Sequence, residues 1–283
     1  MKLPVLFLLV LINSSVSAQY YYKDILGTKE SADMISNYRN NKVHRVIVNS
    51  YDENNVRIAN FVLQQEFSPV KQALTTITKT DQANQSVLTT FIDAAGRVIK
   101  SIDSSESVIN QSVYHYNSTG QLTSISITSN QPGKNITESE EHIWQYTNGK
   151  VSRMLRIKNK IDTTFVDFKL DESGNVIEEQ ETKKGKKSIP VLYYYDDKNR
   201  LTDIVRFNNK ARRLLPEYLF EYSPSNQVIQ KITVPAAGSE YIIWRYQYDQ
   251  KGLRIKEAIY NKQKQLTGKI EYQYSFGSYP SPG

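Results

Sequence analysis

The chain has 283 residues, a formal net charge of +7 and no cysteine. This length allows one large domain or two small ones, and the lack of cysteine excludes a disulfide scaffold, so burial and backbone pairing must supply the stability. Tyrosine is frequent, with 20 residues against 9 phenylalanines and 2 tryptophans, which favours β-strands with partly wet faces.

Residues 1–18 have the composition of a secretory signal peptide. Lys2 precedes an apolar run from Leu3 to Ile12, and Val16-Ser17-Ala18 fits a small-x-small cleavage site before Gln19. The run is too short to favour a retained membrane helix, and no later segment is apolar enough to form one. We therefore expect an exported protein in the periplasm, on the cell surface or secreted. It is not a lipoprotein, because no cysteine is present to carry a lipid.

Residues 19–45 are expected to form an N-terminal cap segment. Helix-forming residues from Leu26 to Lys42, with Thr28 as a cap, predict a short helix that covers the first edge of a sheet.

Residues 46–276 repeat one short phrase. It consists of an aromatic or aliphatic residue, Asp or Asn, two variable residues, Gly or Asn, and an apolar residue two positions later. Between Gly96 and Gly252, successive turn positions lie 24 to 29 residues apart. The turn positions are Asn55, Gly96, Gly120, Gly149, Gly174, Asn199, Asn226, Gly252 and Lys264.

The phrase is typical of a β-hairpin. Asp or Asn at the first turn position accepts hydrogen bonds from the backbone two residues on, and Gly or Asn at the fourth tolerates a positive φ. This geometry pairs Tyr195 with Leu201, Tyr116 with Leu122 and Tyr222 with Val228 across the strands. Leu201 and Ile204 lie three apart, so either a bulge intervenes or both faces of the strand are partly covered.

The sequence therefore predicts an all-β fold: a long antiparallel β-meander of about nine hairpin repeats, in a curled or twisted open sheet. Open twisted sheets rarely exceed about ten strands without curling. Residues 130–141 and 182–190 are expected to be longer loops, and residues 277–283 a flexible tail. The exposed terminal edges of an open sheet would allow an edge-to-edge homodimer.

These repeats resemble the tyrosine–aspartate (YD, or Rhs) repeat family. The segments Tyr193 to Ile204 and Arg245 to Gly252 are similar to its Y-x-Y-D-x-x-G-R-L unit, although most units here lack the upstream glycine of the family. The resemblance covers about Val46 to Phe276 and implies a spiralling β-strip with a binding or scaffold role. It transfers no catalytic residue, and the chain has too few units for the large shells of that family.

No catalytic constellation stands out in the sequence. His44, His115 and His142 have no metal-ligand spacing, the acidic run near His142 is typical of a solvated loop, and no serine lies in a nucleophile elbow. We expect no enzyme activity, no cofactor and no metal. Nucleic acid is not an expected partner of an exported protein whose positive charge is modest and scattered.

An aromatic column is the candidate binding site. Its members would stack in rows across neighbouring hairpins, either as the core of the sheet or as an exposed platform for sugar rings or peptides. The candidate ligand-binding residues are Trp144, Tyr146, Tyr193, Tyr195, Trp244 and Tyr246.

Three functions remain open from the sequence. The first is a noncatalytic envelope or cell-surface protein that binds or scaffolds a protein partner through an elongated sheet. The second is a carbohydrate-binding module that takes a glycan on the aromatic column. The third is an outer-membrane β-barrel, in which the face that carries Arg245, Lys269, Glu271 and Gln273 would line the lumen.

Overall fold

The computed structural model describes residues 19–80, 85–134, 136–235 and 240–277. The expected signal peptide and nearly all of the expected tail lie outside these residues. Within them, a π-helical turn η1 (Tyr21–Leu26) leads into α1 (Gly27–Asn40). Every other element is a β-strand, and none of the helices described is long and apolar enough to cross a membrane.

All strands belong to one antiparallel sheet. Its first nine strands are β1 (Val43–Asp52), β2 (Phe61–Ser68), β3 (Ala73–Thr80), β4 (Ser86–Ile92), β5 (Val98–Ser104), β6 (Ile109–Tyr116), β7 (Leu122–Gln131), β8 (Ile136–Thr147) and β9 (Lys150–Lys158). The next five are β10 (Asp162–Leu170), β11 (Val176–Lys183), β12 (Lys186–Lys187), β13 (Val191–Tyr195) and β14 (Leu201–Asn208). The last five are β15 (Arg213–Tyr222), β16 (Val228–Thr233), β17 (Ile242–Tyr248), β18 (Arg254–Tyr260) and β19 (Leu266–Phe276).

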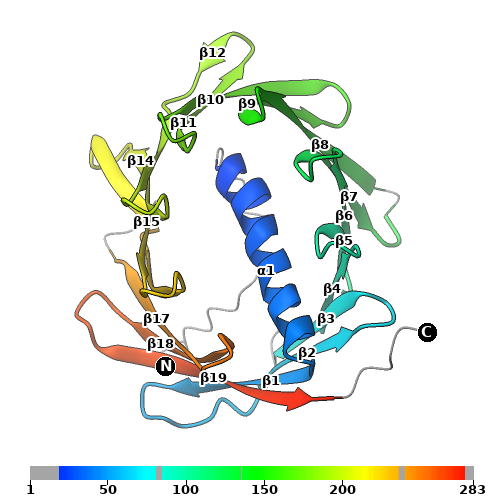
Figure 1. Cartoon of the computed structure of the whole chain (residues 1–283), viewed down its shortest axis with the longest axis vertical. Coiled ribbons are helices and arrows are strands. Elements are labelled where there is room, and N and C mark those ends of the chain that lie inside the picture. The colour runs from blue at the N-terminus through cyan, green and yellow to red at the C-terminus, as the bar shows by residue number, and fades with distance from the viewer. Residues whose placement is uncertain (1–18, 81–84, 135, 236–239, 278–283) are drawn as a thin grey trace.

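The sheet closes into a barrel. Each strand pairs with its neighbours in the sequence, and β1 pairs with β19 from Val43↔Phe276 to Asp52↔Gly268. The short strand β12 pairs only with β11, which also pairs directly with β13, so β12 projects from the ring and the other 18 strands form it. Figure 1 looks into this ring.

The prediction of an open curled sheet was therefore wrong, although the all-β antiparallel meander was correct. The physical reason is that an open sheet leaves two rows of unpaired backbone groups, and closure satisfies both rows at once. Closure pairs the two terminal strands, β1 and β19, with each other. These are the edges through which we expected an edge-to-edge homodimer to form.

The hairpin chemistry is confirmed. All nine predicted turn positions have a positive φ, including 83° at Gly96, 57° at Asn199 and 60° at Lys264. The Oδ1 atom of Asp249 accepts hydrogen bonds from the amides of Lys251 and Leu253, as predicted for the first turn residue.

A bulge follows the turn in the repeated hairpins. Tyr195 pairs with Leu201 while Tyr194 pairs with Asp203, which leaves one extra residue after the turn. Leu201 and Ile204 are both buried in the same cluster, so the bulge explains how residues three apart reach one face. Residues 130–141, predicted as a loop, instead fall largely in β7 and β8, which pair from Ser124↔Ile143 to Gln131↔Ile136.

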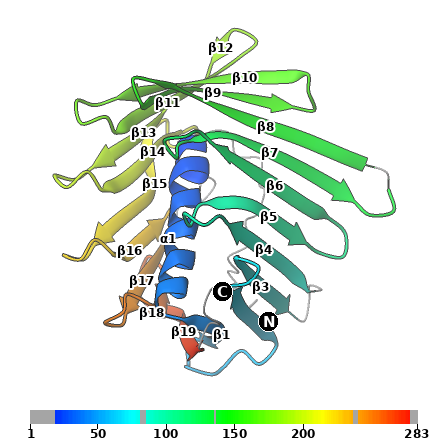
Figure 2. The same cartoon turned by 45° about the vertical axis from the view of Figure 1, so that its right-hand side comes forward.

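The helix α1 crosses the mouth of the barrel that carries the tight turns (Figures 1 and 2). Its Ile35 and Tyr38 are buried in a cluster with Val46 of β1, Phe67 of β2 and Leu253, which directly precedes β18. The Nδ2 atom of Asn37 also donates to the carbonyl of Gly252, in a tight turn, over 2.9 Å. The helix thus covers a mouth and not a sheet edge, because closure leaves no edge of the ring for it to cover.

Candidate functional site at the covered mouth

The inner face of the barrel holds the N-terminal segment. Tyr20, Tyr21, Tyr22, Ile25 and Leu26 pack against a cluster of buried strand residues. That cluster comprises Leu122, Ile125, Trp144, Val151, Met154, Val166, Phe168, Val176, Val191, Tyr193, Leu201 and Ile204. The segment η1 is therefore part of the core, and α1 continues from it across the mouth.

Glu179 on β11 fixes the start of this segment. Its side chain is completely buried and accepts the backbone N–H of Gln19 at 2.7 Å, that of Tyr20 at 2.9 Å and that of Tyr21 at 3.1 Å. The Tyr193 hydroxyl donates a fourth hydrogen bond over 2.7 Å. Burial raises the pKa of Glu179, and these four donors oppose that shift because they stabilise the ionised carboxylate.

His142 on β8 forms a second anchor. Its Nδ1 lies 2.6 Å from Asp24 Oδ2 and its Nε2 lies 2.9 Å from Glu140 Oε1. Each ring nitrogen faces a carboxylate acceptor, so both carry a proton and the ring is an imidazolium. Burial lowers the pKa of His142, but Asp24 and Glu140 outweigh burial and raise it to about 9.

Arg156 completes this chain of charges. It donates to Glu140 over 2.6 Å. Burial raises the pKa of Glu140, but hydrogen bonds from His142 and Arg156 outweigh it and lower the pKa to about 2. The arrangement Asp24–His142–Glu140–Arg156 thus links η1 to β8 and β9 through paired charges.

A third charged group lies beneath the helix. Glu257 on β18 is buried, pairs with Arg254 at 3.0 Å and accepts a hydrogen bond from the Tyr272 hydroxyl. The Arg254 guanidinium lies 4.3 Å from the ring centre of Tyr246. Paired charges and aromatic rings therefore pack the barrel here, and the contacts are those of an interior, not of an open catalytic cleft.

The aromatic column lies on the inner face. Trp144 and Tyr193 are buried at 3% and 1% exposure, and Trp144 stacks on Phe168 with ring centres 5.3 Å apart. Trp244 lies opposite the inward-facing Lys231, and it is half-buried like Tyr246. Ligand binding by the column stays a prediction, but its buried members could reach a glycan only if the barrel opened.

Tyr146 and Tyr195 belong to a row of tyrosine hydroxyl hydrogen bonds around the mouth, which we call the tyrosine ladder. Six tyrosines, five of them from the repeated phrase and the sixth Tyr274 on β19, each donate the hydroxyl to a backbone carbonyl two residues beyond the turn position of the preceding hairpin, at 2.7 to 2.9 Å. The donor–acceptor pairs are Tyr116–Val98, Tyr146–Leu122, Tyr195–Val176, Tyr222–Leu201, Tyr248–Val228 and Tyr274–Arg254. The ladder joins neighbouring hairpins to one another.

The buried glutamates Glu179 and Glu257 were not predicted, although their place in the repeat indicates them. Five residues after the turn position, the repeats place buried Ile125, Met154 and Ile204. The same repeat position holds Glu179 and Glu257 in other units, and both are equally buried. A charge at an otherwise apolar, inward repeat position predicts a buried, partnered charge.

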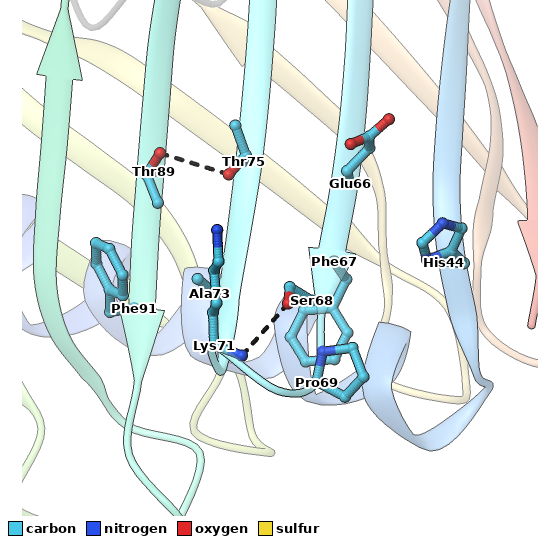
Figure 3. A pocket seen from close by; sticks show the side chains of 10 residues that line it. All are labelled: His44, Glu66, Phe67, Ser68, Pro69, Lys71, Ala73, Thr75, Thr89 and Phe91. Carbon is cyan, nitrogen blue, oxygen red and sulfur yellow. Dashed lines mark hydrogen bonds between the residues drawn. The ribbon is translucent and has the colours of Figure 1, made fainter. Parts of the chain in front are cut away.

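A shallow pocket on the outer wall is the other candidate. It lies beside the β2–β3 turn, and Figure 3 views it from outside with α1 behind the wall. Its lining includes His44, Glu66, Lys71 and Phe91. Glu66 already accepts a hydrogen bond from Gln64 at 2.7 Å, and the polar side chains do not converge on one point. Within the described residues, no group of three or more His, Cys, Asp or Glu side chains could hold a metal ion.

The outer wall carries charged pairs beside exposed apolar side chains such as Phe165 and Ile229. On β9 and β10, Arg153 and Asp167 form an ion pair of 2.6 Å, and both side chains are 46% exposed. The face of β19 that carries Lys269 and Glu271 points outward, because Tyr272 and Tyr274 of the opposite face pack into the inner cluster. The expectation that this charged face would line a lumen was therefore wrong.

No family model matches the sequence, and no curated protein matches it. Similar solved structures include a porin-like protein from Bacteroides uniformis, 10% identical over 83% of this chain and 97% of that chain, with a TM-score of 0.38. The Photorhabdus luminescens Tc holotoxin pore is 13% identical over 76% of this chain, with a TM-score of 0.34. The TcdB2–TccC3 structure is 14% identical over 76%, with a TM-score of 0.32. The chain spans only 12% and 13% of these two toxin chains. Likenesses this low carry no argument about function.

Proposed function

We propose that the chain is a noncatalytic exported protein of the bacterial envelope or cell surface, which binds or scaffolds a partner through the outer wall of a closed, water-facing barrel. The observation that carries this proposal is the set of charged and polar side-chain pairs on the wall at mid-strand. Besides the Arg153–Asp167 pair, Arg245 on β17 donates to Gln230 on β16 over 3.0 Å. Lys269 and Glu271 form a further pair of 2.8 Å on β19.

An outer-membrane barrel is the second candidate, and the closed ring of strands is the observation that favours it. A barrel of that kind needs an outward apolar band about 25 Å tall, and a Lys or Arg on the lipid face costs about 2–4 kcal/mol at the midplane. Charged pairs at mid-strand on β9, β10 and β19 interrupt such a band. Water therefore suits this wall better than lipid.

We also propose that the chain is a short YD-repeat protein whose array closes on itself. Support comes from the tyrosine ladder, which gives the repeated tyrosine the same hydrogen bond in five of the seven units that have one. The ladder lacks a donor where the repeat has Leu170 or Ile92 in place of tyrosine.

The test is the behaviour of residues 19–283 without detergent. We expect a monodisperse protein in aqueous buffer by light scattering, and release into the soluble fraction when the full chain is exported in a Gram-negative host. Insolubility without detergent, together with recovery in the outer-membrane fraction, would reject the water-facing barrel in favour of the membrane barrel. A double substitution of Arg153 and Asp167 to Ala serves as a control, because it should leave the protein in the same fraction.

A further inference from the structure

The backbone nitrogen of Gln19 occupies an unusual place. It lies 2.7 Å from Glu179 Oε1, Gln19 is only 2% exposed, and Glu179 is completely buried. The side chain of Gln19 is held as well, because its Nε2 donates to Glu217 Oε2 over 2.7 Å. The first residue after the expected cleavage site is thus buried in the barrel with both its main chain and its side chain bound.

Glu179 lacks a matching cation. Three of its four hydrogen-bond partners are backbone N–H groups, which can only donate, and the fourth, the Tyr193 hydroxyl, donates to Oε2, so all four bonds favour the carboxylate form. A buried carboxylate is costly unless a positive charge compensates it. Among the described residues, the nearby Arg156 and Arg206 pair with Glu140 and Glu217, and no Lys, Arg or His side chain forms an ion pair with Glu179.

We infer that the missing cation is the α-amino group of Gln19, released when the signal peptide is cleaved after Ala18. Hydrolysis of the Ala18–Gln19 peptide bond by a signal peptidase consumes one water and leaves a carboxylate on Ala18. The new amino group of Gln19 takes up a proton at neutral pH and becomes an ammonium with three N–H donors. Glu179 is therefore the binding site for the mature N-terminus, and processing completes the docking of η1.

The backbone of Gln19 supports the same conclusion. In the continuous chain its φ is 98°, a region that residues other than glycine rarely adopt. This dihedral is defined by the carbonyl carbon of residue 18. Cleavage removes that atom from the chain, so the mature N-terminus occupies the same position without the restriction. Charge compensation and backbone geometry, which are independent observations, both favour a chain that begins at Gln19.

The first experiment uses the processed protein as the host exports it. Its intact mass should correspond to a chain that starts at an uncyclised Gln19. An amine-directed reagent near neutral pH should modify the α-amino group readily in urea and far more slowly in the folded protein, as measured by peptide mapping. A chain that starts at another residue, that has cyclised to pyroglutamate, or whose amine reacts equally fast in both states would overturn the proposal.

The second experiment is a double-mutant cycle. One protein begins at Gln19, and the other carries Gly-Ser before Gln19, so that an amide replaces the ammonium. The extension should raise the unfolding equilibrium constant roughly a hundredfold, because it removes one member of a buried ion pair. The effect should nearly vanish with Glu179→Gln. It should persist with Glu178→Gln, the matched control, whose side chain pairs with Lys169.

An extension that changes nothing in the wild-type background, or that acts equally with Glu179→Gln, would also overturn the proposal. Should Glu179→Gln fail to fold, the amine-modification experiment still decides the matter. A negative result in either N-terminus experiment does not affect the solubility test of the water-facing barrel. The docking of the mature N-terminus and the proposed function can therefore be rejected independently.

Discussion

Single residues decide how the N-terminal segment is held in the barrel. His142 bridges Asp24 of η1 and Glu140 of β8, and Glu179 binds three consecutive backbone amides. Such charges are stable in an interior only when partners satisfy them, so removing one partner costs more than the pair itself contributes.

The His142 cluster predicts a pH dependence. The pKa of His142 is about 9 in the folded protein and 6.5 in the unfolded chain, so it is raised by folding. Its stabilisation is complete below pH 6.5 and is lost as the pH rises to about 9, a loss of up to about 3 kcal/mol. Urea unfolding at several pH values between 6 and 9 measures it.

His142→Gln should flatten this dependence and lower the stability at pH 6. His115→Gln is the control, because His115 is exposed on the outer face of β6, and it should keep the wild-type slope. A slope that survives in His142→Gln would assign the effect to another group.

At the scale of elements, the hairpin is the unit of this molecule. Eight of the nine repeated units combine a turn with a positive φ and a bulge, and in five of these eight a tyrosine hydroxyl reaches the preceding hairpin. The bulge brings residues two and five beyond the turn position to the same inner face, where they pack against η1 and α1.

The ladder predicts a cost for the loss of one hydroxyl. Tyr222→Phe removes the 2.7 Å hydrogen bond to the Leu201 carbonyl and keeps the ring, so it should destabilise the protein by about 0.5–1.5 kcal/mol. Tyr194→Phe, on the outer wall at 48% exposure, should change stability far less. Urea unfolding of both variants compares them, and equal stabilities would show that the ladder contributes nothing.

At the scale of the whole molecule, closure is the decisive feature. The pairing of β1 with β19 joins strands that lie at opposite ends of the sequence, and it forms a ring that α1 crosses at one mouth. The ring has no open edge for another copy to extend.

Closure can be tested because the chain has no native cysteine. Ile47 and Gln273 lie directly opposite each other across the β1–β19 seam. Ile47→Cys with Gln273→Cys should therefore form a disulfide within one chain under mild oxidation, detected by mass spectrometry and non-reducing electrophoresis.

The control pairs Ile47→Cys with Asp167→Cys on β10, which lies far around the ring in Figure 1, and it should not cross-link within one chain. If the seam pair formed only disulfides between chains, the sheet would be open and paired edge to edge.

The sequence by itself determined the local structure. The residues of each turn dictate a positive φ and a hairpin, and alternation along each strand separates an aromatic face from a charged one. The pairs Tyr195↔Leu201, Tyr116↔Leu122 and Tyr222↔Val228 followed from turn geometry and are confirmed.

Only the tertiary structure decided which face is inside, where α1 lies and whether the sheet closes. These features depend on the twist and bulges accumulated over many strands and on contacts between residues more than a hundred positions apart, such as Gln19 with Glu179. Local patterns carry no record of such distances, so the sequence left the charged face free to line a lumen in the outer-membrane barrel alternative, and it did not predict that α1 covers a mouth. The barrel turns the aromatic face inward because its tyrosines and tryptophans gain more by packing on the N-terminal segment than by contact with water.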